Sequence, residues 1–176
     1  MAMPPIFVLG YSEAAMLLAK QTDVHISALI AICGQREFAV DGGGIIHTLV
    51  LHFDDIDAID DADPFQASIA RTRHRERAAL GLRGTAPTME DARRIIEFAQ
   101  TIRDMDGALL CHCLGGVSRS AAAALLVMAA WTGPGCEDEC VRQLRLIRPC
   151  ASPHRDLIGF GDSILNRAGQ LVGALG

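Results

Sequence analysis

The segment that most restricts the fold of this chain is Ala108–Cys113, a continuous apolar run that leads into a pair of glycines, Gly115 and Gly116. A run this short, without alternation of apolar and polar residues, is typical of a strand buried on both faces. An alanine-rich helical pattern follows at Ser120–Trp131. Because such a strand needs helices on both sides of its sheet, the segment predicts an α/β fold.

The rest of the chain repeats the alternation of short apolar runs with helical patterns. We expect strands at Ile6–Leu9, His25–Cys33 and Ile45–Phe53. We expect helices at Glu13–Lys20, at Glu137–Ile147, after the capping pair Thr88 and Asp91, and after Ser152-Pro153. This order of elements predicts a central, mostly parallel sheet of about 4–5 strands flanked by helices.

Length and composition predict a single domain over residues 1–176. Half of the 176 residues are hydrophobic and 21% are charged, which is enough apolar material for one core. The pair Asp63-Pro64 is typical of a helix start and predicts a helical insertion at about 64–84. This segment carries a basic run, for which we expect a solvated helix face, with recruitment of an acidic partner as the alternative. The run consists of Arg71, Arg73, His74, Arg75 and Arg77.

Charge and hydropathy exclude two classes of partner. A formal net charge of -5 argues against binding of nucleic acid through bulk electrostatics. The longest apolar run, Ala121–Trp131, is shorter than the roughly 18 residues that a membrane-spanning helix needs. The first basic residue is Lys20, so the start of the sequence lacks the basic region of a secretory signal, and we expect a cytoplasmic protein.

The six cysteines are expected to be free thiols in that compartment. Four residues form a zinc-like set, but their spacing is irregular and two of them fall on a predicted helix among acids. They are Cys136, Cys140, Cys150 and His154. We therefore expect neither a metal nor another cofactor.

The segment that carries chemistry runs from His112 to Ser120. A buried strand delivers Cys113 to its carboxyl end, five residues follow, and Arg119 stands where a helix begins. Ligands of open α/β sheets bind at this edge. The five-residue loop can turn its backbone N–H groups inward as an anion nest at the positive end of the helix, and Arg119 adds planar donors for a phosphoryl group. These loop residues are Leu114, Gly115, Gly116, Val117 and Ser118.

The same electrostatic field acts on the thiol of Cys113. A helix N-terminus and an arginine favour the thiolate, which is the nucleophilic form. Ser120 is placed to donate a hydrogen bond to the sulfur when it must leave, and His112 to fix the loop through backbone hydrogen bonds. Covalent catalysis by Cys113 follows as the leading expectation.

The sequence His112-Cys113-Leu114-Gly115-Gly116-Val117-Ser118-Arg119-Ser120 resembles the signature of cysteine-dependent protein tyrosine phosphatases, closest to the compact dual-specificity branch. The resemblance implies a single catalytic domain with a mostly parallel sheet and a metal-independent reaction through a cysteinyl-phosphate. It implies Cys113 as nucleophile and Arg119 as phosphate ligand. The chain departs from the pattern at His154, where relatives often carry an amide, and in having Tyr11 as its one tyrosine.

A general acid upstream of the cysteine is the second element of that family. Leu51–Ile56 ends a strand with acids, and we take Asp55 as the first candidate and Asp54 as the second. Spacing does not separate them from the neighbouring acids Asp57, Asp60, Asp61 and Asp63.

The expected function is hydrolysis of a phosphomonoester, with phosphotyrosine in a protein as the leading substrate class and phosphoserine, phosphothreonine or a small phosphomonoester as further ones. Two alternatives stay open. One is a phosphate-binding pseudophosphatase, if no upstream acid reaches the site. The other is a rhodanese-like or arsenate-reductase-like enzyme, which also uses a cysteine loop with an arginine.

Overall fold

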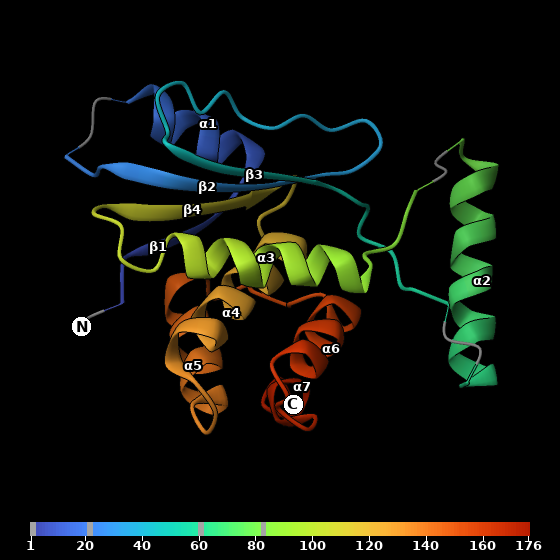
Figure 1. The fold of residues 1–176 in the computed structure, drawn as a ribbon. Coiled ribbons are helices and arrows are strands. Elements are labelled where there is room, and N and C mark those ends of the chain that lie inside the picture. Colours follow the sequence, from blue (N-terminus) through green and yellow to red (C-terminus); the bar gives the residue numbers. More distant parts are fainter. Residues whose placement is uncertain (1–2, 21–22, 60–61, 82–83) are drawn as a thin grey trace.

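Four parallel strands form the centre of the protein (Figure 1). The computed structural model describes residues 3–20, 23–59, 62–81 and 84–176. The strands are β1 (Ile6–Gly10), β2 (Ile26–Cys33), β3 (His47–His52) and β4 (Ala108–Cys113), in the sheet order β1-β4-β2-β3. The prediction of a parallel α/β sheet with a central strand at Ala108–Cys113 is confirmed.

Strand β4 lies between β1 and β2, and all six of its residues are buried. Its Cys111 pairs with Val8 on one side and with Ile30 on the other. Cys113, the last residue of β4, pairs with Gly10 at the end of β1. The carboxyl ends of β1, β2 and β4 therefore meet at one edge of the sheet, where ligands of parallel α/β folds bind.

Helices cover the two faces of the sheet unequally (Figure 1). Helix α1 (Tyr11–Ala19) packs on one face, over Leu29, Ala31 and Leu110. The other face carries α3 (Met89–Thr101), α4 (Arg119–Thr132), α5 (Glu137–Ile147), α6 (Arg155–Ile164) and the short α7 (Gln170–Gly173). Nearly every side chain of α4 is buried, because α4 contacts the sheet and its neighbouring helices at once.

Element boundaries follow the expected capping signals. The hydroxyl of Thr88 accepts a hydrogen bond from Asp91 N at the start of α3, and the Asp91 carboxylate accepts one from Thr88 N, which confirms the predicted capping box. The predicted strand Ile45–Phe53 is shorter, since β3 begins at His47. Among the described residues, no helix is long and apolar enough to cross a membrane.

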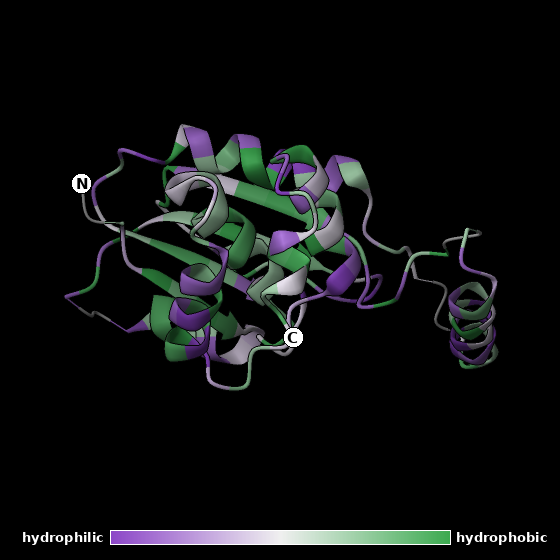
Figure 2. Cartoon of the chain, turned by 90° about the horizontal axis from the view of Figure 1, so that it is seen from below, coloured by the Kyte–Doolittle hydropathy of each residue, from purple (hydrophilic) through white to green (hydrophobic). Residues whose placement is uncertain are grey.

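Helix α2 (Pro64–Ala79) lies within the predicted segment 64–84 and stands clear of the sheet (Figures 1 and 2). The carboxylate of Asp63 caps it by accepting from Phe65 N and Gln66 N. Two arginines of the basic run do not form a plain solvated face, because Arg73 pairs with Asp57 and Arg77 with Asp54.

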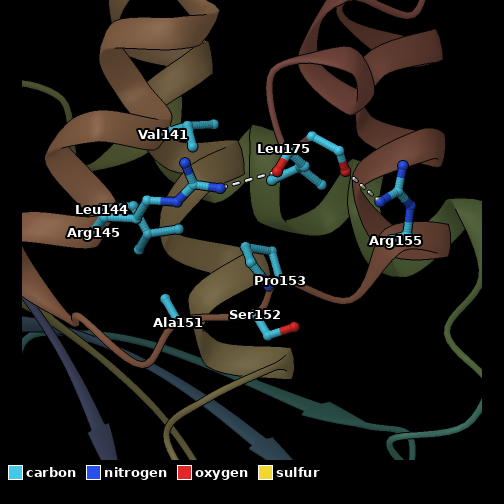
Figure 3. A pocket seen from close by; sticks show the side chains of 9 residues that line it. Val141, Leu144, Arg145, Ala151, Ser152, Pro153, Arg155 and Leu175 are labelled. Carbon is cyan, nitrogen blue, oxygen red and sulfur yellow. Dashed lines mark hydrogen bonds between the residues drawn. The ribbon is translucent and has the colours of Figure 1, made fainter.

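The last residues of the chain pack against α5 and α6 through two arginines (Figure 3). Arg145 donates to the carbonyl of Leu175 at 2.9 Å, and Arg155 to that of Gly176 at 3.1 Å. These contacts border a cavity that also reaches Ser152. The guanidinium groups of both arginines therefore already have backbone acceptors within the chain.

Candidate active site

Cys113 lies at the base of a loop that connects β4 to α4. Its Sγ atom accepts a hydrogen bond from Gly116 N at 3.3 Å and lies 3.2 Å from Ser120 Oγ. Only 3% of Cys113 is exposed. The strand and the first turn of α4 thus bring the predicted nucleophile and the predicted hydroxyl donor into contact.

The carbonyl groups of the loop accept hydrogen bonds from residues outside the loop. Leu114 O accepts from Tyr11 N at 3.0 Å, and Val117 O accepts from Ser152 N at 2.9 Å. Gly115 O and Gly116 O both accept from the guanidinium of Arg148, at 3.3 and 3.0 Å.

This outward anchoring fixes the direction of the loop amides. In a planar trans peptide, the N–H group points opposite to the preceding C=O. The N–H groups of residues 115–118 consequently face the side opposite these four anchors. Together with the N-terminus of α4, they form the concave set of donors that an oxyanion requires.

Gly116 is the position where this loop requires glycine. Its φ is +69°, in the left-handed region. A Cβ atom there would lie 2.3 Å from Gly10 N and 2.4 Å from the carbonyl carbon of Leu9. The loop therefore packs directly on the end of β1. Gly115 has open space at the corresponding position.

Arg119, the first residue of α4, is buried, and two residues outside the loop accept hydrogen bonds from its guanidinium group. Its Nη1 donates to Glu37 Oε2 at 2.8 Å and to Phe53 O at 3.1 Å, and its Nη2 donates to Glu37 Oε1 at 3.1 Å. Burial lowers the pKa of Arg119, but the hydrogen bonds to Glu37 and the electrostatic interactions with Cys113, Glu37 and Asp55 together outweigh burial and raise the pKa, so Arg119 stays charged. The buried Nε of Arg119 has no hydrogen-bond partner among the described residues.

Glu37 is a site residue that the sequence analysis missed. It follows β2, and it also accepts a hydrogen bond from Gly34 N at 2.7 Å. Burial raises the pKa of Glu37, but the hydrogen bonds from Arg119 and Gly34 N and the charges of Arg119 and Arg77 outweigh burial, so the net pKa is lowered. The signal in the sequence is an acid just beyond a buried strand, at the edge where β4 delivers Cys113.

His112 is buried beneath the site, and its role in fixing the loop through backbone hydrogen bonds stays a prediction. Its Nε2 accepts a hydrogen bond from Val40 N at 3.3 Å, and its ring meets the ring of Tyr11 edge-on at a centroid distance of 6.2 Å. Burial lowers the pKa of His112 below its ordinary value, which agrees with a neutral ring that accepts at Nε2.

Asp55 faces the loop from the segment after β3. Its Oδ1 accepts from Ser118 Oγ at 2.6 Å and lies 3.9 Å from His154 Nε2. The side chain of Asp55 is 48% exposed, so a ligand at the loop can reach it. His154, one of the departures from the family pattern, is itself buried and within hydrogen-bond distance of Ile56 O at 3.0 Å.

The other acids of this stretch that the structure describes have partners outside the loop. The carboxylate of Asp54 accepts from Gln35 N at 3.2 Å and from Thr85 N at 3.1 Å, and it is largely buried. Asp57 pairs with Arg73, and Asp63 caps α2. Asp60 and Asp61 lie outside the described residues.

Solved structures share this fold over most of the chain. The human tyrosine phosphatase-like serine/threonine/tyrosine-interacting protein aligns with a TM-score of 0.58 and 17% identity, over 91% of this chain and 90% of that one. Tk-PTP in its active form gives 0.56 and 14%, over 95% and 94%. DUSP15 gives 0.54 and 17%, over 99% and 92%. No protein-family model and no curated protein matches the sequence.

These alignments extend over nearly the full length of each neighbour. The protein has the fold of the cysteine-dependent protein tyrosine phosphatases, in the compact form of the dual-specificity phosphatases.

Proposed function

We propose that this protein hydrolyses phosphomonoesters through a cysteinyl-phosphate intermediate, as a protein tyrosine or dual-specificity phosphatase. The observation that carries the proposal is the loop itself, in which a buried thiol accepts a hydrogen bond from Gly116 N and the four carbonyls that follow it bond to residues outside the loop. Residues 1–176 form the catalytic domain in this proposal, with α2 as an insertion.

In the first step, Cys113 Sγ attacks phosphorus. An S–P bond forms while the P–O bond to the leaving group breaks. The inward N–H groups and Arg119, with its unpartnered Nε, stabilise the charge on the phosphoryl oxygens. Because these donors are held before the substrate arrives, little reorganisation opposes the step.

Asp55 acts as the general acid. Its exposed carboxyl protonates the ester oxygen as the P–O bond breaks, and the carboxylate then accepts a proton from the attacking water. Water oxygen bonds to phosphorus, the S–P bond breaks, and the sulfur leaves beside the hydroxyl of Ser120. Inorganic phosphate is released, and the free enzyme is regenerated.

Phosphotyrosine in a protein is the proposed substrate class. Within the loop, Arg119 is the single cationic side chain, and the residues before it add no positive charge. A site for multiply phosphorylated inositides would gain from additional lysines or arginines. The composition of the loop therefore favours a substrate with one phosphoryl group.

The decisive experiment is hydrolysis of para-nitrophenyl phosphate by the wild type and by Cys113→Ser, in the presence of a chelator and with vanadate as inhibitor. We expect activity that vanadate blocks, that the chelator leaves intact and that Cys113→Ser lacks. Turnover by Cys113→Ser would refute the nucleophile. An inactive but folded and reduced wild type would favour the pseudophosphatase or sulfur and arsenate chemistry.

The two candidate acids separate by leaving group. Asp55→Ala should lower kcat on phenyl phosphate by about 10²–10⁴-fold and spare substrates with good leaving groups. Asp54→Ala should instead lower the unfolding midpoint, because the carboxylate bonded to Gln35 N and Thr85 N is lost. The reverse pattern would transfer the acid role to Asp54.

A further inference from the structure

A largely apolar cavity adjoins the loop that follows Cys113, at Leu114. Its volume is about 200 Å³, and it is lined by Tyr11, Ile32, Arg36, Glu37, Phe38 and Leu114. The lining comes from the start of α1, the end of β2 with the segment that follows it, and the first loop residue after Cys113.

The rim of this cavity exposes three large side chains to solvent. Phe38 is 78% exposed, Leu114 60% and Tyr11 38%. Exposed side chains of this size cost free energy in water, and a cluster of them around a hollow marks a binding surface. None of these three side chains belongs to the buried core, although the ring of Tyr11 contacts that of His112 edge-on.

Two residues of the cavity lining belong to, or contact, the proposed phosphate site. Leu114 directly follows the nucleophile, and Glu37 holds Arg119 through both carboxylate oxygens. Asp55, which contacts Ser118 at the other end of the loop sequence, is not part of this lining. A substrate whose phosphate lies on the loop is therefore next to the residues that line this cavity.

We propose that the cavity binds one apolar side chain next to the phosphotyrosine of a peptide substrate, an inference that rests on the proposed function. The volume is below that of pockets for drug-sized molecules and suits a single side chain better than an acyl chain. Arg36, at the rim, offers donors to the main-chain carbonyls of an extended peptide.

The test pairs a change in the protein with a change in the peptide. Phosphotyrosine peptides carry leucine or glycine at the positions beside the phosphotyrosine. Their Kd is measured on the non-hydrolysing Cys113→Ser protein, alone and combined with Phe38→Ala. Phe65→Ala is the matched control, because Phe65 is 72% exposed on α2 and lies outside the cavity.

We expect the leucine peptide to bind about 10-fold more tightly than the glycine peptide, as burial of one aliphatic side chain predicts. Phe38→Ala should remove most of this preference, whereas Phe65→Ala should keep it. In the background with Cys113 intact, the control Phe65→Ala should leave hydrolysis of para-nitrophenyl phosphate unchanged.

Several results would overturn the inference. If the two peptides bind equally well, or if Phe65→Ala has the same effect as Phe38→Ala, the cavity does not bind the residue next to the phosphotyrosine. A different result would assign the cavity to a lipid: Phe38→Ala does not change peptide binding but lowers the hydrolysis of phosphatidylinositol phosphate in vesicles. Failure of the proposed function is distinct, because it appears as an inactive wild type while peptide binding is still measured.

Discussion

Glu37 and Arg119 form a bidentate pair, with both carboxylate oxygens accepting from the two terminal nitrogens of the guanidinium at 2.8 and 3.1 Å. The guanidinium side chain is 5% exposed. A planar fork held on one edge has its remaining nitrogen fixed in direction. The pair therefore orients the arginine that the proposed reaction places on the phosphoryl oxygens.

Glu37→Ala should lower kcat on para-nitrophenyl phosphate by about 10²-fold, because a small misplacement of a catalytic group has an effect of this order. Glu37→Gln keeps one acceptor for Arg119 and should lose less. Steady-state kinetics of both variants, with a check of their unfolding midpoints, measures the effect. A kcat of wild-type size in Glu37→Ala would contradict the orienting role.

Arg148 is the external support of the loop. It donates to the carbonyls of Gly115 and Gly116, and its Nη1 also pairs with Glu13 at 2.9 Å. Arg148→Met keeps much of the side-chain volume but leaves both carbonyls without this donor. We expect a loss of about 1–3 kcal/mol in the free energy of unfolding and a lower kcat. Urea unfolding checks the first, and unchanged stability and kcat would refute the support.

The sheet and the loop between Cys113 and Arg119 are predictable because their signals are local. An apolar run identifies β4, and the spacing from Cys113 to Arg119 sets the loop between a strand and a helix. These features need only short-range information about burial and turn chemistry.

The supports of the loop were not predictable in the same way. Glu37 lies 82 residues from Arg119 in the sequence, and Val40 lies 72 residues from His112. Their contacts depend on which strands become neighbours in the sheet. A single acid or a backbone N–H in the sequence does not indicate that strand order. The pairing of Arg77 with Asp54 is hidden for the same reason within a run that predicts a solvated face.

Acid should destabilise the protein through His112. Burial lowers the pKa of this side chain in the folded state, whereas the unfolded chain has the ordinary value of 6.5. Above that value both states are neutral and the full stability is present. As the pH falls below it, the unfolded chain takes up a proton that the folded state resists, and stability declines down to the folded pKa.

Unfolding midpoints in urea measured from about pH 8 to about pH 5 should therefore fall for the wild type. His112→Gln removes the titrating group and should flatten this part of the curve, at the cost of a lower midpoint at neutral pH. Identical slopes in the two proteins would assign the pH dependence to other groups.

The two loop glycines should differ in their tolerance of alanine. Gly116→Ala forces a Cβ into Gly10 N at a positive φ, and we expect a loss of more than about 3 kcal/mol in the free energy of unfolding. Gly115→Ala meets open space and should change that free energy by less than about 1 kcal/mol. Chemical unfolding of both variants tests the difference, and equal losses would exclude the close packing on β1.

Helix α2 should influence the general acid without touching it. Arg77 lies 3.7 Å from Asp54, and Arg73 and His74 contact Asp57, so these bonds flank Asp55 on both sides. Because these bonds hold the segment that carries Asp55, Arg77→Ala should lower kcat on phenyl phosphate by about 10-fold. The kcat on substrates with good leaving groups should stay nearly unchanged.

Arg75→Ala is the matched control, because it removes the same charge from the same helix. The side-chain hydrogen bonds of Arg75 in the described chain go to Arg71 O and Thr72 Oγ1, both within α2. Arg75→Ala should leave both substrates unaffected. An equal loss in Arg75→Ala would indicate a general effect of helix charge. A loss in Arg77→Ala that is the same for both leaving groups would place the effect on the nucleophile or the loop, because only proton transfer from Asp55 depends on the basicity of the leaving oxygen.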